Sequence, residues 1–144
     1  MIVSGTTTVP IAAPELWASL SDPERLGNAL PHVDGVDTHG DGSFSAWARP
    51  RTAVGETPLR MDFQIADRRE GEYVRIVSEG TAGENFVKLS VELDLSPDGD
   101  STQARWTADV HVRGVLASLV QRSLPAVLAE QVNEVLAAAG AAAA

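Results

Sequence analysis

The chain has 144 residues and a formal net charge of −9 at pH 7, from 20 acidic and 11 basic residues. A surface this negative repels phosphate groups and anionic lipid headgroups, so we expect no nucleic-acid partner. Cysteine is absent, which excludes disulfides, thiolate nucleophiles and iron–sulfur ligation. The length, with 44% hydrophobic and 22% charged residues, fits one soluble globular domain.

Neither targeting nor membrane insertion is indicated by the sequence. The opening MIVSGTTTVP lacks a basic region and an apolar region, so we expect no signal peptide. No run reaches the roughly 18 apolar residues that a membrane span needs, so we expect no transmembrane segment and a cytoplasmic protein. We further expect a single domain over residues 1–140 and a disordered alanine-rich tail over residues 141–144.

The N-terminal part predicts one strand followed by two short helices. Residues 2–9 are rich in valine and threonine, as strands are. Pro14 suits the first turn of one helix, and Pro23, with Ser21 or Asp22 as the cap, suits that of a second. A helix as short as the second is unstable alone, because nucleation costs too much for so few hydrogen bonds. We therefore expect it to be pressed against a larger element.

From residue 33 to about residue 113 the hydrophobic pattern has a period of two. The alternation is cleanest in residues 87–95 and 104–112, which are joined by the turn sequence PDGDS. Strands of this kind form an antiparallel sheet with one polar face and one apolar face. The apolar face requires a cover.

The cover is predicted to be a long helix within residues 114–140. Its apolar stripe is formed by Val120, Leu124, Val127, Leu128, Val135 and Ala139. Pro125 either kinks one long helix or begins a second one after Ser123. The predicted fold is therefore α+β of the helix-grip type: a curved antiparallel sheet of about seven strands wrapped on a long C-terminal helix, with two short helices after the first strand.

The segment TVPIAAPELWASLSDPERLGNALPHVDGV resembles the opening of the START-like (SRPBCC) superfamily, which includes the polyketide cyclases and the Bet v 1-like pollen allergens. Within it, the sequence is similar to the G-subunit family of carbon monoxide dehydrogenases at Val9-Pro10, Pro14, Trp17, Leu20, Asp22-Pro23-Glu24, Leu26 and Leu30-Pro31. The resemblance implies a deep apolar cavity between sheet and helix for lipid-like, quinone-like or polyketide-like ligands. It also implies an accessory role toward a molybdenum hydroxylase partner.

Apolar side chains predicted to line the space between the sheet and the long helix are the candidate ligand-binding residues. They are Met61, Phe63, Ile65, Ile76, Trp106, Val110 and Leu128, together with Gln131. Gln131 falls near the centre of the predicted stripe, where an unpaired amide costs about 1–3 kcal/mol. Its partner is either a ligand carbonyl or a backbone group or buried water. Trp106 either fills the core or stacks on a flat ligand.

No catalytic or metal-binding motif is present. His32, His39 and His111 lie far apart without metal-ligand spacing, so we expect neither a metal nor a cofactor. His32 follows Pro31 at the predicted closed end of the groove, and it is either an acid–base residue or a plain loop histidine. The catalytic residues thus remain unknown, with His32 as the candidate.

Three functions remain open at this stage. The first is a non-enzymatic carrier or accessory protein that binds an apolar or aromatic molecule. The second is a polyketide cyclase-type enzyme in which His32, Gln131 and the arginines at residues 49, 51 and 60 do the chemistry, unless that arginine group is merely solvated. The third is a protein-interaction subunit whose cavity has been filled by side chains.

Overall fold

A computed structural model of the chain contains three helices and nine strands among the residues that it describes. The described residues are 1–30, 33–39, 42–48, 51–52, 55–56, 59–82, 85–114 and 124–143. The helices are α1 (Ala13–Leu20), α2 (Pro23–Ala29) and α4 (Leu124–Ala143). The strands are β1 (Ile2–Val9), β2 (Gly35–Thr38), β3 (Ser43–Ala48), β4 (Arg51–Thr52), β5 (Gly55–Glu56), β6 (Leu59–Arg69), β7 (Tyr73–Ala82), β8 (Asn85–Asp98) and β9 (Ser101–Arg113).

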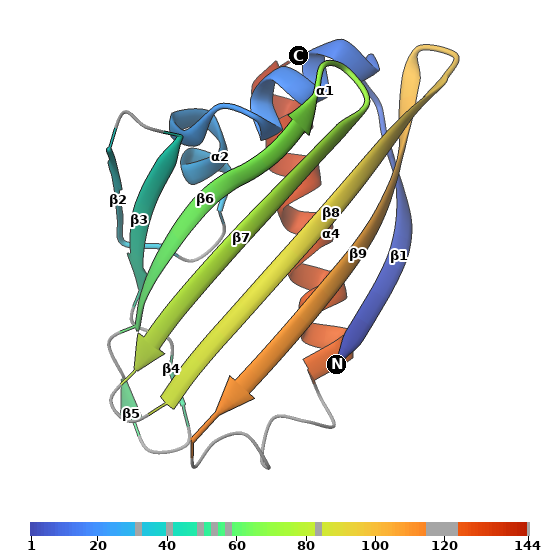
Figure 1. Cartoon of the computed structure of the whole chain (residues 1–144). Helices are drawn as coiled ribbons and strands as arrows, with labels where there is room; N and C mark the ends of the chain where they lie inside the picture. Colours follow the sequence, from blue (N-terminus) through green and yellow to red (C-terminus); the bar gives the residue numbers. More distant parts are fainter. Residues whose placement is uncertain are drawn as a thin grey trace.

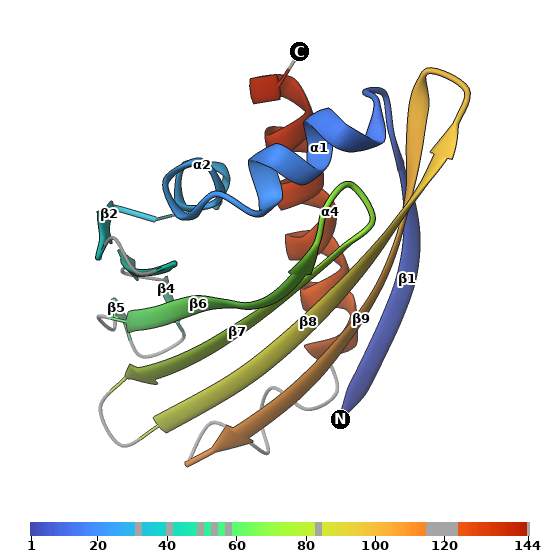
Figure 2. The same cartoon turned by 45° about the horizontal axis from the view of Figure 1, so that its top comes forward.

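Seven of these strands form one antiparallel sheet in the order β1-β9-β8-β7-β6-β3-β2, and β4 pairs with β5 separately. The sheet curves around α4, which runs along its concave face (Figure 1). Both short helices lie across the end of the sheet at which α4 reaches the C-terminus (Figure 2). The predicted helix-grip fold is confirmed.

The two short helices are held by a cap and by bonds to the sheet. Asp22 Oδ1 accepts the backbone N–H of Glu24 at 3.1 Å, and Pro23 occupies the first turn of α2, where it has no intrahelical partner to lose. In α1, Trp17 Nε1 donates to the Tyr73 carbonyl at 3.0 Å. The first of these helices, α1, is therefore fixed to β7.

The second helix is pressed on the sheet through its glycine. A Cβ atom at Gly27 would lie 2.6 Å from Val36 Cγ1 of β2 and 3.5 Å from the ring of Phe44 in β3. Only a residue without a side chain allows so close an approach. Leu26, 2% exposed, is buried on the same helix. This packing explains how a helix of seven residues remains stable.

The long helix begins at Leu124 and carries Pro125 in its first turn, where a missing N–H costs nothing. Residues 115–123 lie outside the described part of the chain, and Val120 of the predicted stripe lies there too. Residues 141–143, predicted as part of a disordered tail, are helical. Alanine has the highest helix propensity, which favours continuation of the helix.

The apolar stripe predicted for the long helix is wrong along one of its two edges. The side chains that face the core are those of Leu128, Val132, Val135, Leu136 and Ala139. Val127 is 45% exposed, and Gln131 is exposed as well. At about 100° per residue, both lie on the flank of the helix rather than on the face toward the core. The amide of Gln131 therefore does not need the buried partner that the prediction gave it.

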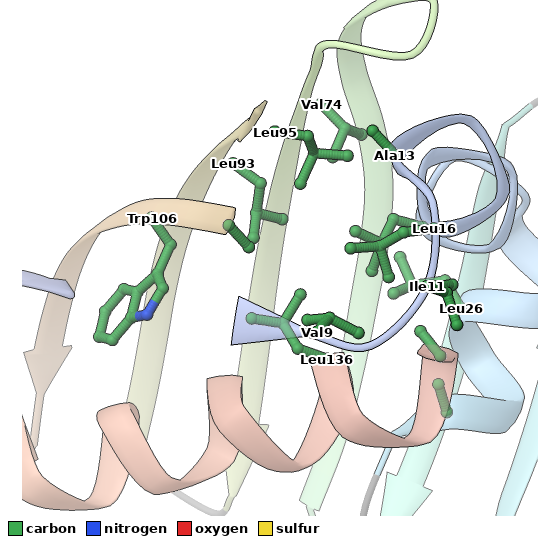
Figure 3. Close-up of a cluster of buried hydrophobic side chains, with 14 of the residues drawn as sticks. Val9, Ile11, Ala13, Leu16, Leu26, Val74, Leu93, Leu95, Trp106 and Leu136 are labelled. Carbon is green, nitrogen blue, oxygen red and sulfur yellow. The ribbon is translucent and has the colours of Figure 1, made fainter. Parts of the chain in front are cut away.

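The end of the sheet beneath α1 and α2 is filled by a continuous core, which we call the filled end (Figure 3). Its labelled members in Figure 3 are Val9, Ile11, Ala13, Leu16, Leu26, Val74, Leu93, Leu95, Trp106 and Leu136. Each of these side chains is at most 7% exposed. Burial of this apolar surface, at about 25 cal/mol per Å², is the main source of stability here.

Tyr73, the single tyrosine of the chain, offers a direct test of this arrangement. Its hydroxyl donates a hydrogen bond of 2.8 Å to Glu92 Oε1 on β8. Desolvation, followed by the hydrogen bond and the negative charge of Glu92, raises the pKa of Tyr73 from 10.0 to about 12. An ultraviolet absorbance titration is expected to give one tyrosinate midpoint near this raised pKa.

The same shift makes stability depend on alkaline pH. Because the folded pKa of Tyr73 is higher than the unfolded one, its contribution to the free energy of unfolding is complete below pH 10 and declines as the pH rises toward about 12. In the Glu92→Gln variant the hydrogen-bonding carboxylate is gone, so the midpoint should fall toward 10.0. An unshifted midpoint in the unmodified protein would contradict the described environment of Tyr73.

Candidate functional site

Along the concave face, most inward-facing residues remain apolar beyond the filled end. Their side chains, however, are no longer fully buried. On β8, Leu95 and Leu93 are 5% and 3% exposed, whereas the next inward-facing residues, Val91, Leu89 and Val87, are all partly exposed. Apolar side chains therefore face inward without being fully covered by the protein. Such surface is a common feature of ligand-binding sites.

The strand register brings five inward-facing residues of three strands together, and we call them the apolar patch. They are Met61, Phe63, Ile76, Ser78 and Leu89. Ser78 of β7 is at their centre, because it pairs with Phe63 of β6 on one side and with Leu89 of β8 on the other. Ile76 lies two residues along β7 and so points to the same face.

A stacked aromatic pair forms one border of the apolar patch. The rings of Phe44 and Phe63 have centroids 4.8 Å apart and an interplanar angle of 3°. Phe44 is fully buried beside Gly27 of α2, whereas Phe63 is partly exposed. Since Phe44 holds one side of the pair, the ring of Phe63 is a fixed planar surface at the patch.

A flexible side chain forms another border. A Cβ atom at Gly80 would collide with Met61 Sδ, so the thioether of Met61 lies across the glycine. Gly80 follows Ser78 on the inward face of β7, and it pairs with Met61 of β6. Methionine is unbranched and adapts to neighbouring shapes, so this border can adjust to a bound molecule.

The predicted ligand-binding residues divide into two groups in the structure. Met61, Phe63, Ile65 and Ile76 are partly exposed on the concave face. Trp106, Val110 and Leu128 are buried, with 2%, 3% and 8% of their surface exposed. A Cβ atom at Gly5 would lie 2.7 Å from Trp106 Cζ2, so the indole packs directly on β1. Protein atoms therefore cover these three side chains.

Two further predictions concern polar residues. His32 and Arg49 lie outside the described residues, and the side chain of Arg51 is not described either. Arg60 lies on the convex face, where its guanidinium is 3.5 Å from the carboxylate of Asp62. Alternation along β6 places Arg60 opposite to Met61, and its side chain is 67% exposed, which agrees with the alternative that this arginine is solvated.

Ser78 and Leu89 belong to the apolar patch although neither was predicted as a site residue. Leu89 falls at an inward-facing position of the alternating pattern on β8. Only its partial exposure distinguishes it from the core residues of the same strand. Ser78 is the polar residue in a row that continues Val74 and Ile76 on the inward face of β7. A polar residue at an apolar position of an alternating strand was the available signal.

On the convex face, a serine, a histidine and an aspartate lie within hydrogen-bond distance. Ser45 Oγ donates to Asp62 Oδ1 at 2.6 Å, and its distance to His39 Nε2 is 2.9 Å. Asp62 bonds the serine hydroxyl itself, whereas in a catalytic triad the aspartate bonds the histidine and the serine proton passes to that histidine. This cluster therefore links the residue after β2 to β3 and β6 and does not have the arrangement of a nucleophilic triad.

Neither a metal-binding cluster nor a membrane-spanning helix occurs among the described residues. No group of three or more histidine, cysteine or acidic side chains is arranged to hold a metal ion there. Within the same ranges, no helix is long and apolar enough to cross a membrane.

Comparison with known proteins identifies the family. The model of the CoxG family, the G subunit of carbon monoxide dehydrogenase, matches residues 5–142. A search of curated proteins finds no match.

Solved structures with the same fold cover almost the whole chain. A conserved protein from Geobacillus kaustophilus has a TM-score of 0.87 and 19% identity, with 99% of this chain and 95% of that chain covered. The Zhui aromatase/cyclase from Streptomyces sp. R1128 has a TM-score of 0.68 and 20% identity, with 99% and 93% covered. A START superfamily protein from Mycobacterium smegmatis has a TM-score of 0.66 and 19% identity, with 94% and 93% covered. The chain therefore has a START-like helix-grip fold and belongs to the CoxG family of carbon monoxide dehydrogenase proteins.

Proposed function

We propose that this protein binds an apolar or aromatic small molecule at the apolar patch, as a carrier or accessory protein. The observation that supports this most directly is the partial exposure of inward-facing apolar residues next to a fully buried core. Each Å² of apolar surface that a ligand removes from water contributes about 25 cal/mol. A lipid, a quinone or a polyketide-like molecule has the apolar area to use this surface.

A flat ring system fits the patch better than a compact aliphatic molecule. Phe63 is held by its parallel stack on Phe44, so its plane is set before any ligand arrives. Aromatic rings favour offset stacking, which adds about 0.5–1.5 kcal/mol beyond burial of area. Met61 can adjust to the outline of such a ring, and an attached aliphatic chain would extend along the remaining apolar side chains of β8.

The chemistry of the patch supports a carrier rather than a cyclase. An enzyme that folds a reactive chain needs a protonatable side chain within hydrogen-bond reach of its substrate. None of the described side chains that adjoin Ser78 on the inward face is titratable: they are those of Met61, Phe63, Ile76 and Leu89. The family membership supports a molybdenum hydroxylase of the carbon monoxide dehydrogenase type as the protein partner.

The test is native mass spectrometry of the protein purified from its own organism, followed by extraction and identification of bound molecules. A stoichiometric apolar molecule that is returned unchanged after incubation is the expected result. A chemically converted molecule would favour a cyclase-type enzyme and contradict the carrier function. An empty protein that also fails to bind added naphthalene derivatives would contradict ligand binding and favour a pure interaction subunit.

A further inference from the structure

Ser78 is the polar residue at the centre of an otherwise apolar surface. It is 2% exposed, and its Oγ atom has no hydrogen-bond partner among the described residues. Its neighbours across the two strand pairings are Phe63 and Leu89, and neither side chain has a group that could accept its proton. A buried hydroxyl without a partner is uncommon and requires an explanation.

The side chain of Ser78 has a definite direction. It shares the inward face of β7 with Val74, which is 0% exposed in the filled end, and with the partly exposed Ile76. The hydroxyl therefore points from the floor of the sheet toward the space that α4 covers. Serine is shorter than the four side chains around it, so its Oγ lies at the base of the apolar patch.

Access to this hydroxyl depends on the surrounding side chains. Phe63 is fixed by its stack on Phe44. Met61 is different, because its thioether lies across Gly80, the next inward position after Ser78 on β7. Rotation of this unbranched side chain is the least costly way to let a ligand atom reach the base of the patch.

We propose that Ser78 Oγ donates a hydrogen bond to an oxygen of the bound molecule and so selects rings that carry a carbonyl or comparable acceptor over pure hydrocarbons. The inference rests on the proposed function and specifies its ligand class. The surrounding apolar side chains provide area, which every hydrophobic molecule can use. The single hydroxyl distinguishes ligands that carry an acceptor oxygen from those that do not. Such an oxygen loses its hydrogen bonds to water when it enters an apolar site, and the hydroxyl replaces one of them.

Two probes that differ in one group test this inference. 1-Acetylnaphthalene and 1-ethylnaphthalene have nearly the same shape, and the first has a carbonyl oxygen where the second has two hydrogens. Their dissociation constants are measured by tryptophan fluorescence for the unmodified protein, for Ser78→Ala and for Ser90→Ala. Ser90 provides the matched control, since it lies on β8 and pairs with Val77, on the convex face of the sheet.

The expected result is a loss of affinity confined to one probe and one variant. Ser78→Ala should bind 1-acetylnaphthalene about 3- to 10-fold more weakly, as expected for one uncharged hydrogen bond, and should bind 1-ethylnaphthalene unchanged. Ser90→Ala should bind both probes as the unmodified protein does. The melting temperature of Ser78→Ala should be equal or higher, because an unsatisfied buried hydroxyl is replaced by an apolar group.

Other results would overturn the inference in recognisable ways. Equal weakening of both probes by Ser78→Ala would show an effect of shape. An unchanged affinity for 1-acetylnaphthalene would exclude the hydrogen bond. A lower melting temperature with unchanged binding would mean that the hydroxyl has a purely structural role. If the unmodified protein binds neither probe, the proposed function itself fails, which is distinct from a failure of Ser78 to discriminate.

Discussion

Leu16→Ala is expected to lower the free energy of unfolding by about 2–5 kcal/mol. Leu16 of α1 is 0% exposed and belongs to the filled end, where it projects from the short helix into the core between the sheet and α4 (Figure 3). Truncation removes its buried methyl groups and leaves a cavity that the surrounding elements cannot fully close. The loss should be large because α1 has only eight residues and depends on this packing.

Chemical denaturation monitored by circular dichroism measures this loss. The matched control is Val127→Ala in α4, whose side chain is 45% exposed, and for which a change within about 0.5 kcal/mol is expected. Equal effects of the two substitutions would contradict the description of the filled end as the stabilising core.

The second large effect concerns ligand binding. Leu89→Trp is expected to weaken binding of 1-ethylnaphthalene at least about tenfold, because the indole would occupy the space above the apolar patch. Leu89 is partly exposed and directly adjoins Ser78, so the added volume has room to extend away from the sheet. Stability should change far less than in Leu16→Ala, since no buried side chain is removed.

Lys88→Trp is the matched control for this substitution. Lys88 is the preceding residue of β8, its side chain is 61% exposed on the opposite face, and its ion pair with Glu79 at 4.0 Å contributes little. Lys88→Trp introduces the same indole outside the apolar patch, so the dissociation constant of 1-ethylnaphthalene should not change. Unimpaired binding in Leu89→Trp, or equal impairment in both variants, would place the ligand elsewhere.

The fold was predictable because each element has a strong local signal. Alternation over residues 87–95 and 104–112 predicts which face of β8 and β9 is apolar, and the register confirms it. Pro23, with Ser21 or Asp22 as the cap, predicts the start of α2 from capping chemistry alone, and Asp22 is the cap in the structure. Strand alternation and helix capping both depend on residues that are close together in the sequence, so both can be read from the sequence alone.

The site was predictable only in part, because it depends on differences in burial among residues with the same pattern. Ile76 and Val110 have equivalent alternation, yet Ile76 is partly exposed and Val110 is 3% exposed. Contacts from other elements decide which of the two is covered, and the alternation within a strand does not contain them. The alanine-rich sequence of α4 also has too little hydrophobic contrast to define which face of the helix is buried. The same weakness placed Gln131 in the stripe. Ser78 was missed because its role depends on Phe63 and Leu89 from two other strands.

The central claim is that the partly exposed end of the concave face, and not the filled end, receives an apolar ligand. Methyl-resolved NMR of the protein titrated with 1-ethylnaphthalene tests it most directly. We expect the largest shift changes at the methyl groups of Met61, Ile76 and Leu89, with those of Leu16 and Leu136 unaffected. Changes centred on Leu16 and Leu136, or none at saturating probe, would contradict the account.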